Sequence, residues 1–124
     1  MFEGALSGRR ILVVEDDYFL AEEWNRKLKA AGAAVLGPVP SVEAALELLE
    51  ADDALDLVVL DVNLGGQMAY PVADALIARK VPFLFMTGYD QSSLPERFAA
   101  IRRLEKPIEA RAILGQLRRL LNTA

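Results

Sequence analysis

The chain has 124 residues, of which 53% are hydrophobic and 26% are charged, and its net charge is −4 at pH 7. This length and balance fit one globular domain with its own core, and the negative charge disfavours non-specific binding to nucleic acid. The chain contains no cysteine and no histidine, which excludes disulfides, thiolate chemistry, imidazole metal ligands and a Ser-His-Asp triad.

The first third of the chain predicts two strands around one helix. Residues 11–14 form a short β-branched run that favours a strand, and residues 19–31 have apolar side chains at helical spacing. Gly32 then provides a stop for this helix. Residues 34–36 predict a second strand, which residues 37–38 (Gly-Pro) are expected to close.

The middle of the chain continues the alternation of helix and strand. Ser41 is a predicted N-cap, followed by an apolar stripe within residues 44–49 that favours a helix. Residues 57–60 are four consecutive apolar residues, which is typical of a strand buried on both faces. Residues 72–78 predict a third helix, with Pro71 tolerated in its first turn.

The last third contains clear and weak elements. Residues 81–86 predict a fourth strand, and residues 94–101 predict a weaker helix that a serine at 92–93 would cap. Residues 103–105 are a poor strand by composition, and residues 109–121 have the apolar spacing of a final helix.

This alternation predicts an α/β fold with a parallel sheet and helices on both of its faces. Residues 1–8 are expected to form a flexible N-terminal arm before a single domain at 9–124. The sequence shows no signal peptide and no apolar run of membrane-spanning length, so a cytoplasmic protein without membrane contact is expected.

Polar residues follow four of the predicted strands, and the carboxyl ends of parallel strands are where such folds bind ligands. These residues are Glu15, Asp16, Asp17, Asp61, Thr87, Gly88, Lys106 and Pro107. Each has a plain explanation alone, and Asp17 is equally well explained as a helix start. Together they predict one site built from carboxylates, a hydroxyl and lysine, which fits hard cations such as Mg²⁺ and phosphate.

Four motifs, VVEDD, VVLDVNLGG, FMTGYD and EKP, occur in this order. The motifs and their order resemble the motifs of a response-regulator receiver domain, and the likeness extends over roughly residues 9–121. The resemblance implies the flavodoxin-like (βα)5 fold of chemotaxis receivers. Its sheet is a doubly wound, five-stranded parallel sheet with strand order 2-1-3-4-5.

The resemblance also implies a phospho-acceptor and a metal site. Asp61 matches the aspartate that accepts a phosphoryl group, and Glu15 and Asp16 match the acidic pair that holds Mg²⁺. The backbone carbonyl of Asn63 matches a further metal ligand. Clustered carboxylates repel one another, and a bound cation would offset that repulsion.

The remaining site residues follow the fourth and fifth strands. Thr87 matches the hydroxyl that reaches the phosphoryl group, Lys106 matches the cation of the family, and Pro107 its usual cis-proline neighbour. Gly88 leaves room for the phosphoryl group and offers an N–H to it.

The function implied is that of a two-component phosphorelay. A sensor histidine kinase or a histidine phosphotransfer protein would supply the histidine that this chain lacks. The chain would not be an enzyme beyond Mg²⁺-dependent self-phosphorylation and autodephosphorylation. As a single-domain receiver, monomeric or weakly dimeric, it would signal by binding an unknown downstream protein, or act as a phosphate sink.

One position departs from the common receiver pattern. Arg103 stands where many receivers have an aromatic residue that couples to the threonine. Tyr89 instead follows Thr87 by two residues, which resembles the FATGUY subgroup of stand-alone, alphaproteobacterial receivers, with Met86 in place of alanine. Tyr89 and residues 90–100 are therefore expected to form the switch.

Phe98 and Ile101 are the expected anchors of the segment at residues 90–100.

Three alternative functions remain open. A flavodoxin-like cofactor binder would need a glycine- or hydroxyl-rich phosphate loop where this chain has acids. An aspartyl hydrolase commonly has a second acid where Asn63 stands, and would need a cap domain. The third alternative is a receiver-like interaction module that is not phosphorylated, which Arg103 keeps open.

Overall fold

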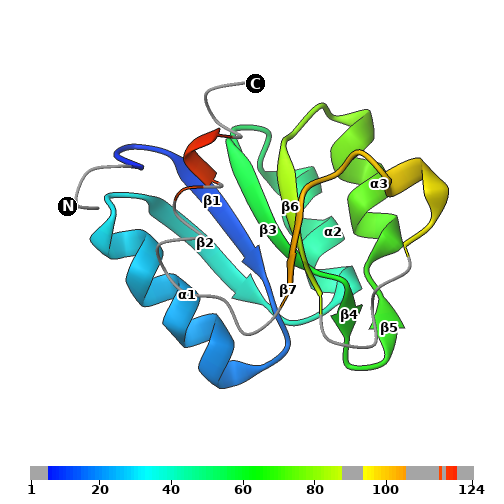
Figure 1. Ribbon diagram of the computed structural model, residues 1–124. Coiled ribbons are helices and arrows are strands. Elements are labelled where there is room, and N and C mark those ends of the chain that lie inside the picture. The colour runs from blue at the N-terminus through cyan, green and yellow to red at the C-terminus, as the bar shows by residue number, and fades with distance from the viewer. Residues whose placement is uncertain (1–5, 88–93, 106–114, 116, 120–124) are drawn as a thin grey trace.

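The structure is a computed structural model that describes residues 6–87, 94–105, 115 and 117–119. A five-stranded sheet forms its centre (Figure 1). The strands of this sheet are β1 (Arg10–Val14), β2 (Ala34–Val39), β3 (Leu57–Asp61), β6 (Phe83–Thr87) and β7 (Arg103–Glu105). The helices with assigned bounds are α1 (Tyr18–Ala30), α2 (Val42–Ala51), α3 (Tyr70–Ala78) and the single 3-10 turn η1 (Glu96–Phe98). A small antiparallel hairpin pairs β4 (Asn63–Leu64) with β5 (Gln67–Met68).

The strand order is β2-β1-β3-β6-β7, and every neighbouring pair in the sheet is parallel. Because the hairpin takes the labels β4 and β5, this is the predicted order 2-1-3-4-5, and the predicted fold is confirmed. Helix α1 covers one face of the sheet, while α2 and α3 cover the other (Figure 1). The three central strands are thus buried on both faces, which is why their sequences do not alternate between apolar and polar residues.

Side-chain alternation along the strands divides the core into two clusters. On β6, Phe83 and Phe85 pack with α2 and α3, whereas Leu84 and Met86 pack on the side of α1. Each fully buried side chain of this size contributes roughly 1.5–3 kcal/mol of transfer free energy. The two clusters fix the sheet in place and leave its carboxyl edge for the site.

The second strand is longer than predicted. Gly37 and Pro38 do not close β2, which continues to Val39 and pairs there with Val14. Proline lacks an N–H, and an edge strand tolerates this because only one of its sides is paired. One extra residue of β2 is accommodated as a shift in register between Leu12 and Val14.

The prediction of a helix over residues 94–101 is wrong. Only η1 forms there, and its N-cap residue Pro95 has an extended backbone with no side-chain cap. Proline also disfavours helical geometry at the residue before it, so a helix cannot begin at Leu94. The predicted serine caps lie outside the described residues. Phe98 is fully buried, and Ile101 packs against the same cluster, as expected of anchors.

The two ends of the chain are described only in part. Leu6, within the predicted arm, is fully buried, and its N–H donates to the carbonyl of Ala31. Of the predicted final helix, residues 115 and 117–119 are helical, and Leu117 is fully buried. No helix within the described ranges is long and apolar enough to cross a membrane.

Candidate functional site

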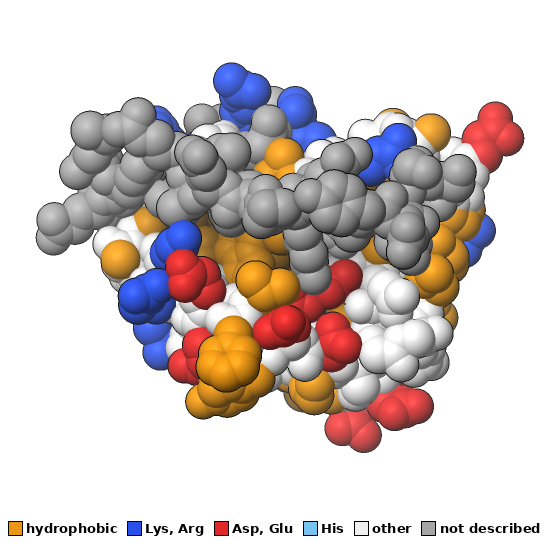
Figure 2. Space-filling model, turned by 60° about the horizontal axis from the view of Figure 1, so that its bottom comes forward, with side chains coloured by type: hydrophobic (Ala, Val, Ile, Leu, Met, Phe, Trp, Pro, Cys, Tyr) orange, Lys and Arg blue, Asp and Glu red, His pale blue; other side chains and the backbone are white. Residues whose placement is uncertain are grey.

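Three strands end side by side at one edge of the sheet. In the register of the sheet, Val14 of β1 lies beside Leu60 of β3, and Asp61 lies beside Met86 of β6. Glu15 directly follows Val14, the last residue of β1, and Thr87 is the last residue of β6. Figure 2 brings this edge forward and shows acidic side chains grouped near its middle, with hydrophobic side chains next to them.

Glu15, Asp16 and Asp61 form the acidic cluster of the site. One ligand oxygen from each carboxylate lies within 4.8 Å of the others. Glu15 and Asp61 are buried, with 4% and 5% of their surface exposed, while Asp16 is exposed. The predicted convergence of these three acids is confirmed. Carboxylates at this spacing suit a hard cation, because such ions take several oxygen ligands and offset the repulsion between the acids.

Asp17 is separate from the cluster and caps α1. Its carboxylate accepts hydrogen bonds from the N–H groups of Phe19 (2.9 Å) and Leu20 (3.1 Å). This satisfies two of the N–H groups that a helix start leaves unpaired. The choice that the sequence left open is therefore settled in favour of the cap.

The turn after Asp61 is held by local hydrogen bonds. The N–H of Asn63 donates to Oδ1 of Asp61 at 3.1 Å, and the Asn63 side chain accepts from the N–H of Gly66 at 2.7 Å. Gly65 and Gly66 have φ angles of +64° and +94°, as a tight two-residue hairpin requires. The turn passes close to Asp16: a Cβ on Gly65 would lie 3.6 Å from its Oδ2. The glycine pair thus lets the chain turn beside the acids.

Thr87 ends β6 beside the cluster and is buried, with 2% of its surface exposed. Its hydroxyl donates to the carbonyl of Leu104 at 3.5 Å, the outer limit for a hydrogen bond. Thr87 points to the same face as Phe85, two residues earlier on the strand. Arg103, which pairs with Phe85 in register, is exposed on β7.

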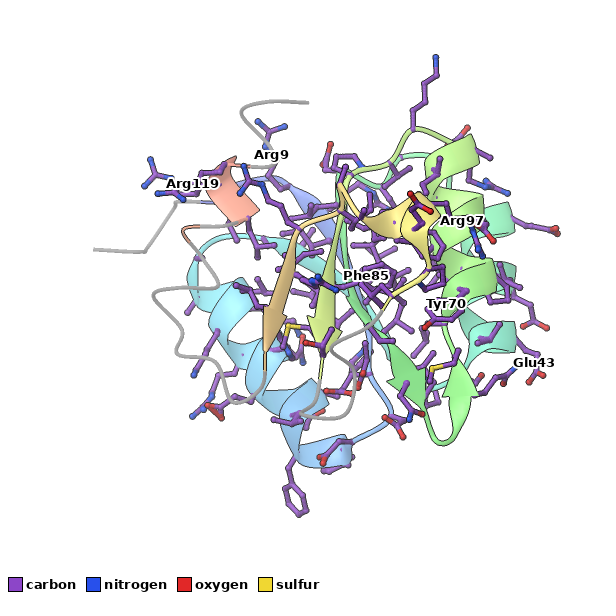
Figure 3. All side chains as sticks on the ribbon, turned by 45° about the vertical axis from the view of Figure 1, so that its right-hand side comes forward. Arg9, Glu43, Tyr70, Phe85, Arg97 and Arg119 are labelled. Atoms are coloured by element: carbon purple, nitrogen blue, oxygen red, sulfur yellow. The ribbon has the colours of Figure 1, made fainter. Side chains whose placement is uncertain are left out.

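An aromatic cluster lies on the Thr87 face of β6, and the sequence did not identify it. The Phe98 ring is 5.6 Å from Phe85 and 5.5 Å from Tyr70, between ring centroids. Figure 3 shows Tyr70 and Arg97 on the same side of Phe85. The Arg97 guanidinium lies 4.4 Å from the centre of the Phe98 ring. The sequence indicated Phe98 as an anchor, but it did not indicate which side chains Phe98 would contact.

Two exposed aromatic residues lie at the start of α1, beside the acids. Tyr18 and Phe19 are 70% and 82% exposed, and their rings meet edge to face. The buried stripe of α1 consists of Ala21, Trp24 and Leu28, so these two residues fall off it. That spacing is the sequence signal that could have marked them as surface residues.

Four predicted site residues lie outside the described residues. They are Gly88, Tyr89, Lys106 and Pro107. In the sequence they come after β6 and β7, and their roles stay predictions.

Comparison with known proteins gives one family. The family model "Response regulator receiver domain" matches residues 11–118. The solution structure of SdrG from Sphingomonas melonis Fr1 is 37% identical, with a TM-score of 0.80 over 94% of this chain and 98% of that one. A solution structure of the BeF3-activated conformation of SdrG from Pseudomonas melonis Fr1 is 34% identical, with a TM-score of 0.76 over 98% and 99%.

Curated relatives are more distant and longer. The sensory transduction protein LytT of Bacillus subtilis (strain 168) is 29% identical over 114 residues, which are 89% of this chain and 47% of LytT. The transcriptional regulatory protein PdtaR of Mycobacterium tuberculosis (strain ATCC 25618 / H37Rv) is 27% identical over 72% of this chain and 43% of its own length. The chain therefore spans less than half the length of these curated relatives.

Proposed function

This chain belongs to the family of response regulator receiver domains of two-component systems, and from that premise we propose that it accepts a phosphoryl group on Asp61 with the help of Mg²⁺. The observation that supports the proposal most directly is the meeting of Glu15, Asp16 and Asp61 at one sheet edge, with ligand oxygens within 4.8 Å. Mg²⁺ prefers oxygen ligands and commonly binds one or two carboxylates together with phosphate.

The proposed transfer begins at the carboxylate of Asp61. One of its oxygens attacks the phosphorus of the donor, and a new O–P bond forms. The bond from phosphorus to the donor's histidine nitrogen breaks, and its electron pair stays with the imidazole, which then takes a proton. Mg²⁺ would supply neutralisation of the charge that develops on the phosphoryl oxygens.

The other residues of the chain position this reaction. The Asn63 N–H holds Oδ1 of Asp61, which fixes the orientation of the carboxylate. The weakly held hydroxyl of Thr87 is free to turn to a phosphoryl oxygen, because its bond to Leu104 is long. In the proposal, Gly88 donates its N–H to the phosphoryl group, Lys106 neutralises its charge, and the Asn63 carbonyl completes the metal ligands.

Receiver domains interact with histidine kinases or phosphotransfer proteins, and we assign the donor to one of these two classes. Output through a downstream protein, or action as a phosphate sink, belongs to the same proposal. The BeF3-activated conformation of SdrG supports a phosphoryl-driven change, because trifluoroberyllate mimics a phosphoryl group.

The proposal is tested with Mg²⁺ and acetyl phosphate, followed by intact-mass measurement. We expect one added phosphoryl group on the wild-type chain, and none after Asp61→Asn or with excess EDTA. Asp17→Asn is the matched control, since Asn also caps helices and Asp17 lies outside the cluster. Equal labelling of Asp61→Asn and wild type would sink the proposal. No labelling of the wild type would favour the unphosphorylated interaction module.

We propose that the switch involves Tyr89 and Pro107, because Arg103 stands where many receivers have an aromatic residue and is exposed on β7. Phe98, in the aromatic cluster, fixes the far end of the proposed switch segment, residues 89–101. We expect amide exchange over residues 89–101 to change when trifluoroberyllate and Mg²⁺ are added, and to change less in Tyr89→Ala. Identical protection with and without the mimic would contradict the switch.

A further inference from the structure

A groove lies at the end of the sheet opposite the acidic cluster. It has a volume of about 370 Å³ and lies between the last turn of α3, the start of β6 and residues 100–102 before β7. Since β6 and β7 begin at this end and carry Thr87 and Glu105 at the other, the groove is separate from the phosphorylation site.

The groove combines an apolar floor with a cationic rim. Leu76 and Phe83 are buried beneath it, and Ile77 is 45% exposed at its side. Lys80 and Arg102 contribute exposed cationic side chains, and the described residues that line the groove include no acid. In a protein with a net charge of −4, the exposed Lys80 cation stands beside exposed apolar atoms in a lining without described acids, which favours an acidic, partly apolar ligand.

Lys80 occupies a backbone position that favours glycine. The N–H of Val81 donates to the carbonyl of Leu76 at 3.0 Å, and that of Lys80 to the carbonyl of Ile77 at 3.1 Å. This pattern is a Schellman motif, which places Lys80 in the left-handed region with a φ of +60°. Among the described residues, no other non-glycine residue has a positive φ.

The end of α1 shows the same motif with glycine. There the N–H of Ala33 donates to Leu28 and that of Gly32 to Lys29, and Gly32 has a φ of +96°. A side chain in this conformation clashes with its own backbone, so a lysine here is disfavoured relative to glycine. Placing a cation at the rim of the groove is a function that glycine could not provide.

We propose that this groove docks a short segment of a partner protein in which an apolar side chain is flanked by carboxylates. The volume suits one or two side chains, and the concave shape does not suit a flat lipid surface. The exposed ammonium of Lys80 would pair with a carboxylate of the segment, while Ile77 and the floor would receive the apolar side chain. The docking would be independent of the chemistry at Asp61.

The docking is tested by titrating the ¹⁵N-labelled protein with designed peptides to about 1 mM, which detects even millimolar affinity. The probe has a central Leu-Phe pair with two aspartates on each side. One control peptide replaces the aspartates with lysines, and another replaces Leu-Phe with serines. We expect saturable shifts at residues 76–83 and 100–102 with the probe alone, weakened by added salt.

Substitutions then assign the contacts. We expect Lys80→Glu to weaken binding of the probe peptide about fivefold or more. Ile77→Ser should also weaken its binding. Lys29→Glu makes the same charge change at an exposed lysine of α1 and should leave binding unchanged. Lys80→Gly should weaken binding without lowering the unfolding midpoint, because glycine fits the motif.

Four results would overturn the proposal. These are no shifts at the groove with the probe, equal shifts with the lysine peptide, unchanged binding by Lys80→Gly, and binding to phosphatidylglycerol vesicles without peptide binding. A lysine present only to stabilise the negative end of the helix dipole would show itself as a lowered midpoint in Lys80→Gly with unchanged peptide binding. Phosphoryl labelling of Asp61 in the same variants checks the fold independently.

Discussion

At the scale of single residues, two glycines with similar positive φ angles have different surroundings. Gly37 in the bulge of β2 has a φ of +82°, and an added Cβ would lie 2.8 Å from the Val39 nitrogen and 2.9 Å from the Val13 carbonyl oxygen. Gly66 has a φ of +94° and open space around it. The first position is constrained by backbone strain and by contact with backbone atoms, and the second by strain alone.

We therefore expect Gly37→Ala to destabilise the protein by about 3 kcal/mol and Gly66→Ala by about 1 kcal/mol. The difference arises because the backbone atoms around Gly37 cannot move aside without breaking the pairing of β1 with β2. Urea unfolding followed by circular dichroism measures both values. Equal losses in the two variants would contradict the steric argument.

At the scale of elements, η1 is held against α3 by one residue pair and one ring. The Arg97 guanidinium donates to both carboxylate oxygens of Asp74, at 2.9 and 3.1 Å, and lies over Phe98. The hydrogen bond from Arg97 lowers the pKa of Asp74 below its usual value, and the Arg97 charge acts in the same direction. The pair thus links the attachment of η1 to pH.

The sign of this pH dependence follows from the lowered pKa. Since Asp74 has a lower pKa folded than unfolded, the ion pair stabilises the fold above the unfolded pKa of about 3.9 and is lost as the pH falls through the folded pKa. Arg97→Gln should therefore lower the free energy of unfolding more at pH 7 than at about pH 3. The loss of the contact between Arg97 and the Phe98 ring contributes to the destabilisation of this variant equally at both pH values.

Urea unfolding at the two pH values measures this difference. Lys29→Gln, which removes an exposed cation of α1, is the matched control and should show no such dependence. A loss in Arg97→Gln that is the same at both pH values would show that Asp74 contributes nothing through its charge.

At the scale of the whole molecule, the proposed metal site would couple cation binding to folding. Glu15 follows β1 and Asp61 ends β3, so their carboxylates meet only when the two strands pair. A cation bound by both stabilises the folded state and has no equivalent site in the unfolded chain.

We expect Mg²⁺ to raise the midpoint temperature of unfolding. At a free concentration a hundred times its dissociation constant, Mg²⁺ should add about 2.7 kcal/mol to the free energy of unfolding. Asp16→Asn should reduce this effect, and Asp17→Asn should retain it. Thermal unfolding in MgCl₂ and in NaCl of matched ionic strength separates binding from screening. The same midpoint in both salts would contradict a metal site at the acidic cluster.

Much of the fold could be predicted because its signals are local. The β-branched runs, the Ser41 cap and the Asp61 strand end are each fixed by a few neighbouring residues, and the structure confirms the parallel sheet and the acidic convergence. The predicted helix over 94–101 did not form: Pro95 disfavours helical geometry at Leu94, and only the 3-10 turn η1 follows it.

The sequence by itself determined which residues reach the carboxyl edge of the sheet, since strand runs and the residues that follow them are read along the chain. Only the tertiary structure decided that β2 runs through Pro38 and that Lys80 and Arg102 line the same groove. The physical reason is range: propensity acts over a few residues, whereas strand pairing, burial and grooves depend on contacts between distant segments.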